Sequence, residues 1–117
     1  MTRTAQKGQT GEAYAAALYE KAGFRILEKN LHSRFGEIDL IAADGETIVF
    51  CEVKLREEGS LVSPLEAVTS QKQEKLRLTA QLYLQKHPTS LQPRFDVVAV
   101  TALGGRITRH EWIQNAF

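Results

Sequence analysis

The stretch "GEIDLIAADGETIVFCEVK", residues 36–54, decides the fold. Two apolar runs flank Asp44-Gly45, a residue pair typical of a tight β-hairpin turn, so the sequence predicts two antiparallel strands. Outside the turn, the same stretch carries four charged residues: Glu37, Asp39, Glu52 and Lys54. Charged side chains inside such an apolar stretch need a physical reason.

The predicted turn fixes which residues face each other across the hairpin. It places Asp39 opposite Phe50 and Glu37 opposite Glu52, and a four-residue loop over 43–46 would keep that register. Side chains alternate between the two faces of a strand. One predicted face is wholly apolar and consists of Ile38, Leu40, Ala42, Val49, Cys51 and Val53. The other face is apolar near the turn and charged at its open end, so we expect a central hairpin covered on both sides.

The charged end of the hairpin is a candidate cation site. Asp39 and Glu52 are predicted diagonal neighbours, with β-carbons about 7–8 Å apart or less, which leaves room for a divalent ion bound through oxygen. Like charges beside an apolar core are costly unless something compensates them. Lys54 offsets one charge, and Mg²⁺ or Mn²⁺ would offset two. The alternative is an ordinary half-exposed sheet end at which Lys54 simply neutralises the acids.

The rest of the chain predicts helices and strands on both sides of the hairpin. We expect a helix over residues 9–22, a strand over 24–30, a charged loop over 56–63, a short helical turn over 64–68, a helix over 70–86 capped by Ser70 with Gln73, and strands over 95–101 and 106–113. The order α-β-β-β-α-β-β predicts an α/β protein with a central mixed sheet flanked by helices.

Length and composition narrow the class of protein. The 117 residues fit one domain, 1–117, in which we expect residues 1–8 to be flexible. A net charge of +1 gives no overall attraction to nucleic acid, so any basic surface must be local. The single cysteine, Cys51, excludes an intramolecular disulfide and reads as a buried hydrophobic residue. His32, His87 and His110 lack the spacing of zinc ligands.

Targeting segments are not expected. The first residues lack the apolar core of a signal peptide, and no window approaches the roughly 18 apolar residues of a membrane span. The default expectation is a cytoplasmic protein without a membrane partner.

The hairpin residues resemble a known nuclease motif. An Asp followed, after a hairpin, by Glu-x-Lys is similar to the PD-(D/E)xK nuclease core, here as Asp39 and Glu52-Val53-Lys54, with Ile38 in place of the motif's Pro. Four blocks in order, "KGQTGEAYAAALYEKAGFRILEKN", "GEIDLIAADGETIVFCEVKLR", "AVTSQKQEKLRLTAQLYL" and "RFDVVAV", resemble the YraN family. That resemblance implies a restriction-endonuclease-like fold related to Holliday-junction resolvases.

The resemblance also implies roles for particular residues. Asp39 and Glu52 would be metal ligands, and Lys54 would position the attacking water or stabilise charge on the phosphate. Glu12 would complete the site from the first helix, although an acid there is also favoured by the helix dipole. Glu37 is either a further metal ligand or a solvated strand-end charge. The implied function is Mg²⁺- or Mn²⁺-dependent hydrolysis of phosphodiester bonds in DNA, branched or otherwise structured. The alternative is a non-catalytic nucleic-acid-binding or adaptor protein that keeps the fold.

Nucleic-acid binding requires phosphate contacts from basic side chains. The candidates that flank the charged end are Lys7, Arg34, Arg56 and Lys72. Lys72 could equally be a surface lysine, and Arg34-Phe35-Gly36 could be either a close approach to a backbone or an ordinary turn. The sequence does not choose between DNA and RNA, and the resemblance to junction resolvases raises a homodimer as one arrangement.

Overall fold

A computed structural model describes the backbone of residues 3–117 and the side chains from residue 11 onward. The elements in chain order are α1 (Arg3–Lys21), β1 (Arg25–Ser33), β2 (Gly36–Ala43), β3 (Thr47–Glu57), α2 (Pro64–Ala67), α3 (Ser70–Lys86), β4 (Gln92–Leu103) and β5 (Arg106–Ile113). The predicted α/β class is confirmed. Helix α1 begins at Arg3, earlier than the expected start near Gln9. For the predicted flexible residues 1–8, residues 1–2 and the side chains of the rest lie outside the described part.

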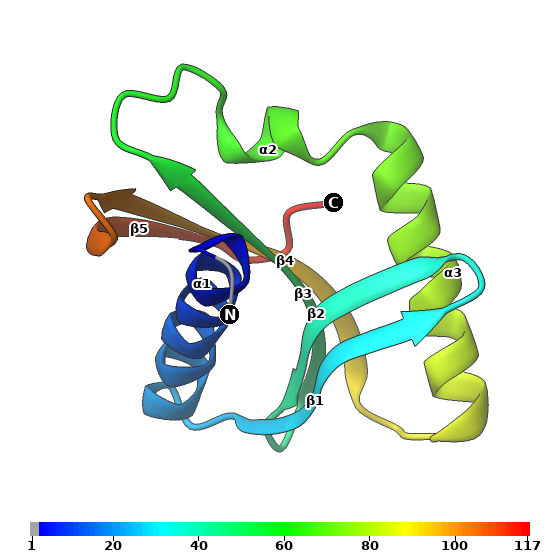
Figure 1. Cartoon of the computed structure of the whole chain (residues 1–117). Helices are drawn as coiled ribbons and strands as arrows, with labels where there is room; N and C mark the ends of the chain where they lie inside the picture. The colour runs from blue at the N-terminus through cyan, green and yellow to red at the C-terminus, as the bar shows by residue number, and fades with distance from the viewer. Residues whose placement is uncertain (1–2) are drawn as a thin grey trace.

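The strands form one mixed sheet with the order β1-β2-β3-β4-β5. Strands β3 and β4 pair in parallel, and the connection between them contains α2 and α3. The other neighbouring strands pair antiparallel. Helix α1 covers one face of the sheet and α3 covers the other (Figure 1). No helix in the described part is both long and apolar enough to cross a membrane.

Each face of the sheet carries its own hydrophobic cluster. The first includes Tyr19 of α1 with Leu40, Val49 and Val98 of the sheet. The second joins sheet residues to α3; its buried members are Ile38, Ile41, Ala43, Ile48, Phe50, Val68, Leu76, Ala80, Tyr83 and Val97. The prediction of a hairpin covered on both sides is therefore confirmed, and Cys51 is buried as expected.

The predicted register of the β2–β3 hairpin was wrong. The structure pairs Ala43 with Ile48 and Ile41 with Phe50. The reason lies in the turn, where the Asp44 carboxylate accepts hydrogen bonds from the backbone N–H groups of Glu46 (2.8 Å) and Thr47 (2.7 Å). Such an Asx turn makes Gly45-Glu46 the two loop residues. Continued outward, this register brings Asp39 level with Glu52 rather than Phe50.

Two local expectations also need correction. Ile38 packs in the cluster under α3 and not with Leu40 in the other cluster. The reason is that regular β2–β3 pairing stops at Leu40. Beyond it, the Asp39 side chain, and not a backbone carbonyl, accepts the hydrogen bond from β3. The cap of α3 is Thr69 rather than Ser70, since the Thr69 hydroxyl accepts from the Lys72 backbone N–H at 3.2 Å.

Candidate functional site

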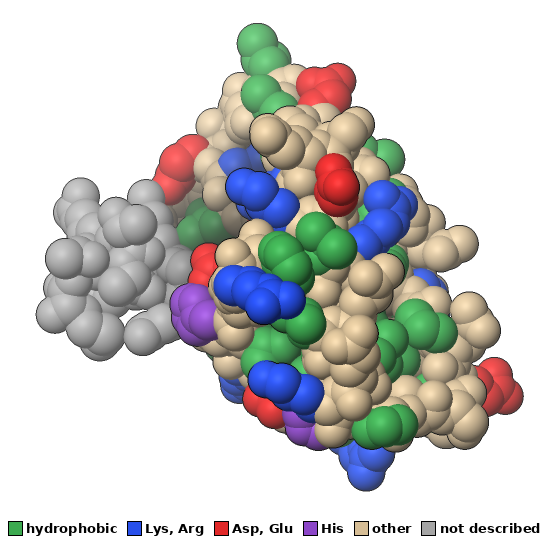
Figure 2. All heavy atoms as spheres, turned by 90° about the vertical axis from the view of Figure 1, so that its right-hand side faces the viewer, with side chains coloured by type: hydrophobic (Ala, Val, Ile, Leu, Met, Phe, Trp, Pro, Cys, Tyr) green, Lys and Arg blue, Asp and Glu red, His purple; other side chains and the backbone are tan. Residues whose placement is uncertain are grey.

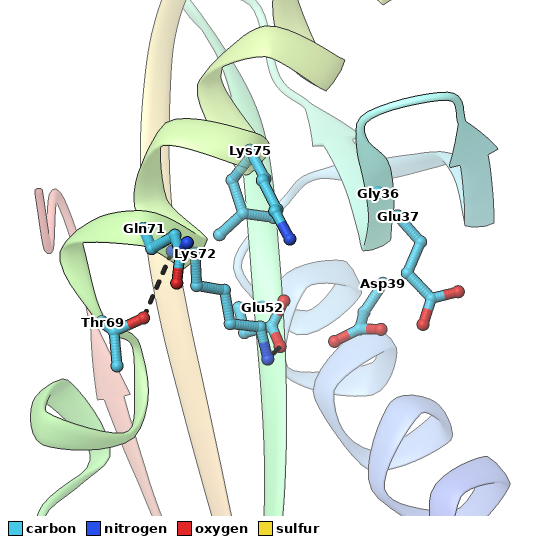
Figure 3. Close-up of a pocket in the computed structure, with 9 residues that line it drawn as sticks. Gly36, Glu37, Asp39, Glu52, Thr69, Gln71, Lys72 and Lys75 are labelled. Carbon is cyan, nitrogen blue, oxygen red and sulfur yellow. Dashed lines mark hydrogen bonds and ion pairs between the residues drawn. The ribbon is translucent and has the colours of Figure 1, made fainter.

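A cavity of about 310 Å³ lies between strands β2 and β3 and the first turns of α3. Its lining residues are Gly36, Glu37, Asp39, Glu52, Thr69, Gln71, Lys72, Lys75 and Leu76. Figure 3 shows Glu37 and Asp39 on one side, the residues of α3 on the other, and Glu52 between them. The structure therefore places Asp39 and Glu52 at one cavity, on the same side of the sheet.

Asp39 is held in place by the strand beside it. Its carboxylate accepts a hydrogen bond from the Val53 backbone N–H at 2.8 Å. Burial raises the pKa of Asp39 to about 7, and the neighbouring Glu52 charge adds to the rise. Glu12 and Glu37 contribute smaller repulsions, while the Val53 hydrogen bond opposes the shift. A carboxyl group that ionises only near neutral pH indicates a place where a positive charge would be stabilising.

Glu52 is a buried acid with two cationic partners. It is 7% exposed, and its Oε1 lies 2.8 Å from Lys72 Nζ and 3.4 Å from Lys54 Nζ. Burial and the neighbouring Lys72 lower the pKa of Lys54. Burial alone would lower the pKa of Lys72, but its hydrogen bonds to Glu52 and Lys54, together with the charges of Glu52 and Asp39, raise it. Lys72 is therefore the firmer ion-pair partner of Glu52.

The other two predicted acids lie at the margin of the cavity. Glu37 lines it, and its Oε2 lies 3.2 Å from His32 Nδ1. Glu12 is not among the lining residues; its Oε2 accepts a hydrogen bond from the Asn30 side-chain amide at 2.9 Å. Glu12 is close enough to add to the negative potential at Asp39. The structure thus brings Asp39 and Glu52 to one cavity, places Lys54 beside Glu52 but not among the lining residues, and leaves Glu12 outside the lining.

The predicted nucleic-acid contacts are spread around the cavity. Lys72 lines it. Arg34 is exposed in the β1–β2 turn, with its guanidinium 5.0 Å from the centre of the Phe35 ring. Arg56 lies further along β3, and its guanidinium donates to the Val62 carbonyl. The side chain of Lys7 lies outside the described residues.

Sequence reasoning missed most of the α3 side of the cavity. Thr69, Gln71, Lys75 and Leu76 were not predicted to line it. Helical spacing could have shown part of this, because positions three and four apart share a helix face, as Lys72, Lys75 and Leu76 do. Residue spacing does not show how the helix packs against the hairpin.

The donor chemistry of the cavity fits a hard divalent cation. Within residues 11–117, no three acidic, histidine or cysteine side chains form a ready-made metal cluster. Asp39 and Glu52 nevertheless supply carboxylate oxygens to the same cavity, and such oxygens suit Mg²⁺ and Mn²⁺. Burial and the Glu52 charge, which raise the pKa of Asp39, are effects that a bound cation would offset. The two carboxylates would hold the cation, with Lys72 displaced from Glu52.

The fold and the cavity define an α/β protein with a charged cleft between a β-hairpin and a helix. Residues 11–100 match the model of the uncharacterised protein family UPF0102, so the chain belongs to that family. A UPF0102 protein of Syntrophus aciditrophicus is 48% identical over 118 residues, which cover 100% of this chain and 92% of the relative. A UPF0102 protein of Stutzerimonas stutzeri is 42% identical over 123 residues, which cover 100% of this chain and 98% of the relative.

Proposed function

We propose that this protein is a metal-dependent nuclease of the restriction-endonuclease-like, PD-(D/E)xK class, as its resemblance to the YraN family implies. The substrate would be DNA, branched or otherwise structured. One observation carries the proposal: Asp39 and Glu52 line a single cavity whose other wall supplies Lys72 and Lys75. Phosphodiester hydrolysis needs carboxylates that can hold a cation and basic groups that can hold the phosphate. In this cavity the two carboxylates face the two lysines.

The roles of the residues follow from their surroundings. Asp39 and Glu52 would hold Mg²⁺ or Mn²⁺, which supplies Lewis acidity and lowers the pKa of bound water. Lys54, 3.4 Å from Glu52, would stabilise negative charge that develops on the phosphate. Lys72, once released from Glu52, and Lys75 would bind the neighbouring backbone phosphates. Glu12 and Glu37 would act from the margin through their negative charge.

A non-catalytic nucleic-acid-binding or adaptor function is the second candidate. It is favoured by the same ion pairs, because Lys72 and Lys54 already neutralise Glu52 without a metal ion. A cavity that is electrostatically balanced in this way could bind phosphate without hydrolysing it. The homodimer and the cytoplasmic location stay predictions.

The decisive experiment is a cleavage assay on DNA of different shapes. Purified protein is incubated with junction, flap, single-stranded and linear duplex DNA in Mg²⁺ or Mn²⁺. We expect cleavage by the wild type and its loss in Asp39→Asn, Glu52→Gln and Lys54→Met. Glu111→Gln, an exposed acid on β5, is the matched control and should cleave like the wild type.

The pattern of results separates the two candidates. Cleavage that survives Asp39→Asn would show a contaminating nuclease and sink the proposal. DNA binding without cleavage, with the binding unchanged in the three variants, would favour the non-catalytic nucleic-acid-binding function. If the protein neither binds nor cleaves any of these DNAs, the result would favour an adaptor function.

A further inference from the structure

The turn between β1 and β2 carries an aromatic residue that the core does not use. The chain has five Phe, three Tyr and one Trp, all in the part whose side chains are described. Of these aromatic residues, Phe35 alone is absent from both hydrophobic clusters. Its ring is half-buried, with the Arg34 guanidinium over it. A ring that contributes to neither core cluster needs another explanation.

Hydrogen bonds join the turn to α3. Arg34 and Phe35 are its two loop residues, because Ser33 pairs with Gly36. The Phe35 backbone N–H donates to Ser33 Oγ at 3.1 Å, and Ser33 Oγ lies 2.9 Å from the hydroxyl of Thr79. Thr79 is 1% exposed and belongs to α3. The ring is thus presented from a fixed backbone and not from a loose loop.

The turn also adjoins the candidate site. Gly36 follows Phe35 directly and lines the cavity. Gly36 adopts φ +150°, which residues with a side chain rarely adopt, so the chain passes from the turn into the cavity wall in a conformation suited to glycine. On the side of the molecule that includes α3, several Lys and Arg side chains lie over the middle and lower parts of the view, between hydrophobic and polar ones (Figure 2). A strand whose phosphate enters the cavity would therefore pass basic side chains and this aromatic turn.

We infer that Phe35 and Arg34 form a stacking platform for an unpaired base next to the phosphate bound in the cavity. Aromatic rings and guanidinium planes both stack on exposed bases. In an uninterrupted duplex the base faces are covered by their neighbours, so the platform selects nucleic acid with unpaired bases at that position. This inference rests on the proposed function and narrows its substrate to DNA with unpaired bases, such as single strands and flaps.

The test measures binding rather than cleavage. Fluorescence anisotropy in EDTA gives the dissociation constants for a labelled single strand and for a blunt duplex of equal length. We expect the wild type to prefer the single strand. Phe35→Ala and Phe35→Leu should each weaken single-strand binding by roughly 5- to 150-fold, the range for one stacked base, and leave duplex binding within about twofold. Phe35→Tyr should bind as the wild type does.

Two further variants sharpen the result. Arg34→Lys keeps the positive charge but loses the planar group, so it should reduce the preference for single strands and spare duplex binding. Leu103→Ala changes a 61% exposed side chain at the end of β4, away from the cavity, and should have no effect on binding. Thermal unfolding checks that the Phe35 variants stay folded, as expected for a ring outside both core clusters.

The outcomes are distinct. Wild-type binding that Phe35→Ala does not change, or that it weakens equally for single strand and duplex, overturns the platform and leaves the proposed function standing. No wild-type binding to either DNA, together with no cleavage in the assay above, overturns the proposed function and the platform with it.

Discussion

At the scale of single residues, the raised pKa of Asp39 makes the free energy of unfolding depend on pH. Well below pH 4, the ordinary pKa of an aspartate, its carboxyl group is neutral in both the folded and the unfolded state. As pH rises, the unfolded chain ionises first, while the folded protein retains the proton up to about pH 7. The raised pKa therefore lowers the free energy of unfolding progressively between these values, and the loss is complete above pH 7.

Asp39→Asn should consequently stabilise the metal-free protein in a pH-dependent way. The amide keeps an oxygen for the Val53 N–H but cannot ionise. We expect a higher melting temperature than the wild type at pH 8 and a much smaller gain at pH 4, measured by thermal unfolding in EDTA. A gain of equal size at both pH values would contradict the electrostatic explanation.

Asp44 supplies a control, because its pKa is shifted in the opposite direction to that of Asp39. Its hydrogen bonds from Glu46 and Thr47 lower its pKa, so its ionised form favours the fold. Asp44→Asn should give no gain at pH 8 and, if anything, a small loss.

Lys72 competes with a cation for Glu52. Its ammonium lies 2.8 Å from the Glu52 oxygen, and metal binding at that oxygen requires the ion pair to open. We predict that Lys72→Met binds Mn²⁺ several-fold more tightly than the wild type and that Glu52→Gln loses binding, measured by titration calorimetry. Weaker binding in Lys72→Met would show that the lysine supports the metal site instead of blocking it.

At the scale of elements, a pair of hydroxyl groups joins the β1–β2 turn to α3. Thr79 Oγ1 bonds Ser33 Oγ and also donates to the Lys75 carbonyl. Thr79→Val keeps the shape but removes both interactions, so we expect a loss of about 1–2 kcal/mol of unfolding free energy. Denaturant unfolding gives the loss, and hydrogen exchange should become faster at the amides around the turn.

Thr108→Val is the matched comparison for this loss. It removes an exposed hydroxyl bond to Glu58 and should leave exchange at the β1–β2 turn unchanged. Faster exchange there in both variants would mean that the Thr79 effect is not local.

The elements also show what the sequence could predict. Periodicity correctly predicted the helix over 70–86 and the strand over 106–113, because each has local signals for its pattern and ends. The hairpin register was missed because the Asp44 side chain, and not the Asp-Gly pair alone, sets the turn.

The candidate site was predictable in part. Asp39, Glu52 and Lys54 could be grouped because the period of a strand is fixed. The α3 wall could not, since it depends on how the helix packs on the sheet. Asp96 was missed altogether, although an acid inside "FDVVAVT" is the same kind of anomaly as an acid inside the hairpin.

At the scale of the whole molecule, Asp96 joins distant parts of the chain. It is 0% exposed and accepts hydrogen bonds from Tyr19 of α1 (2.7 Å), Arg94 (2.9 Å) and Trp112 of β5 (3.1 Å). It also binds the Asn115 backbone N–H at 2.9 Å. Helix α1, the sheet and the last residues thus meet at one carboxylate.

Asp96→Ala should therefore destabilise the whole fold. Removing one member of a buried charged pair typically costs about 3–5 kcal/mol, and the other donors also lose their acceptor. Asp96→Asn should cost less, because its amide oxygen still accepts. Chemical denaturation followed by circular dichroism measures both, and a loss below about 1 kcal/mol in Asp96→Ala would contradict this role.

The position of Asp96 late in the chain also matters for how the protein is made. The Tyr19 hydroxyl is synthesised long before its acceptor, and the central β3 strand emerges before its parallel neighbour β4. On the ribosome, the first helix and the hairpin must wait with their polar and apolar surfaces uncovered until translation reaches β4. Because such long-range contacts slow folding, the interval between translating the hairpin and β4 is the period when the nascent chain is most exposed to aggregation and to chaperones.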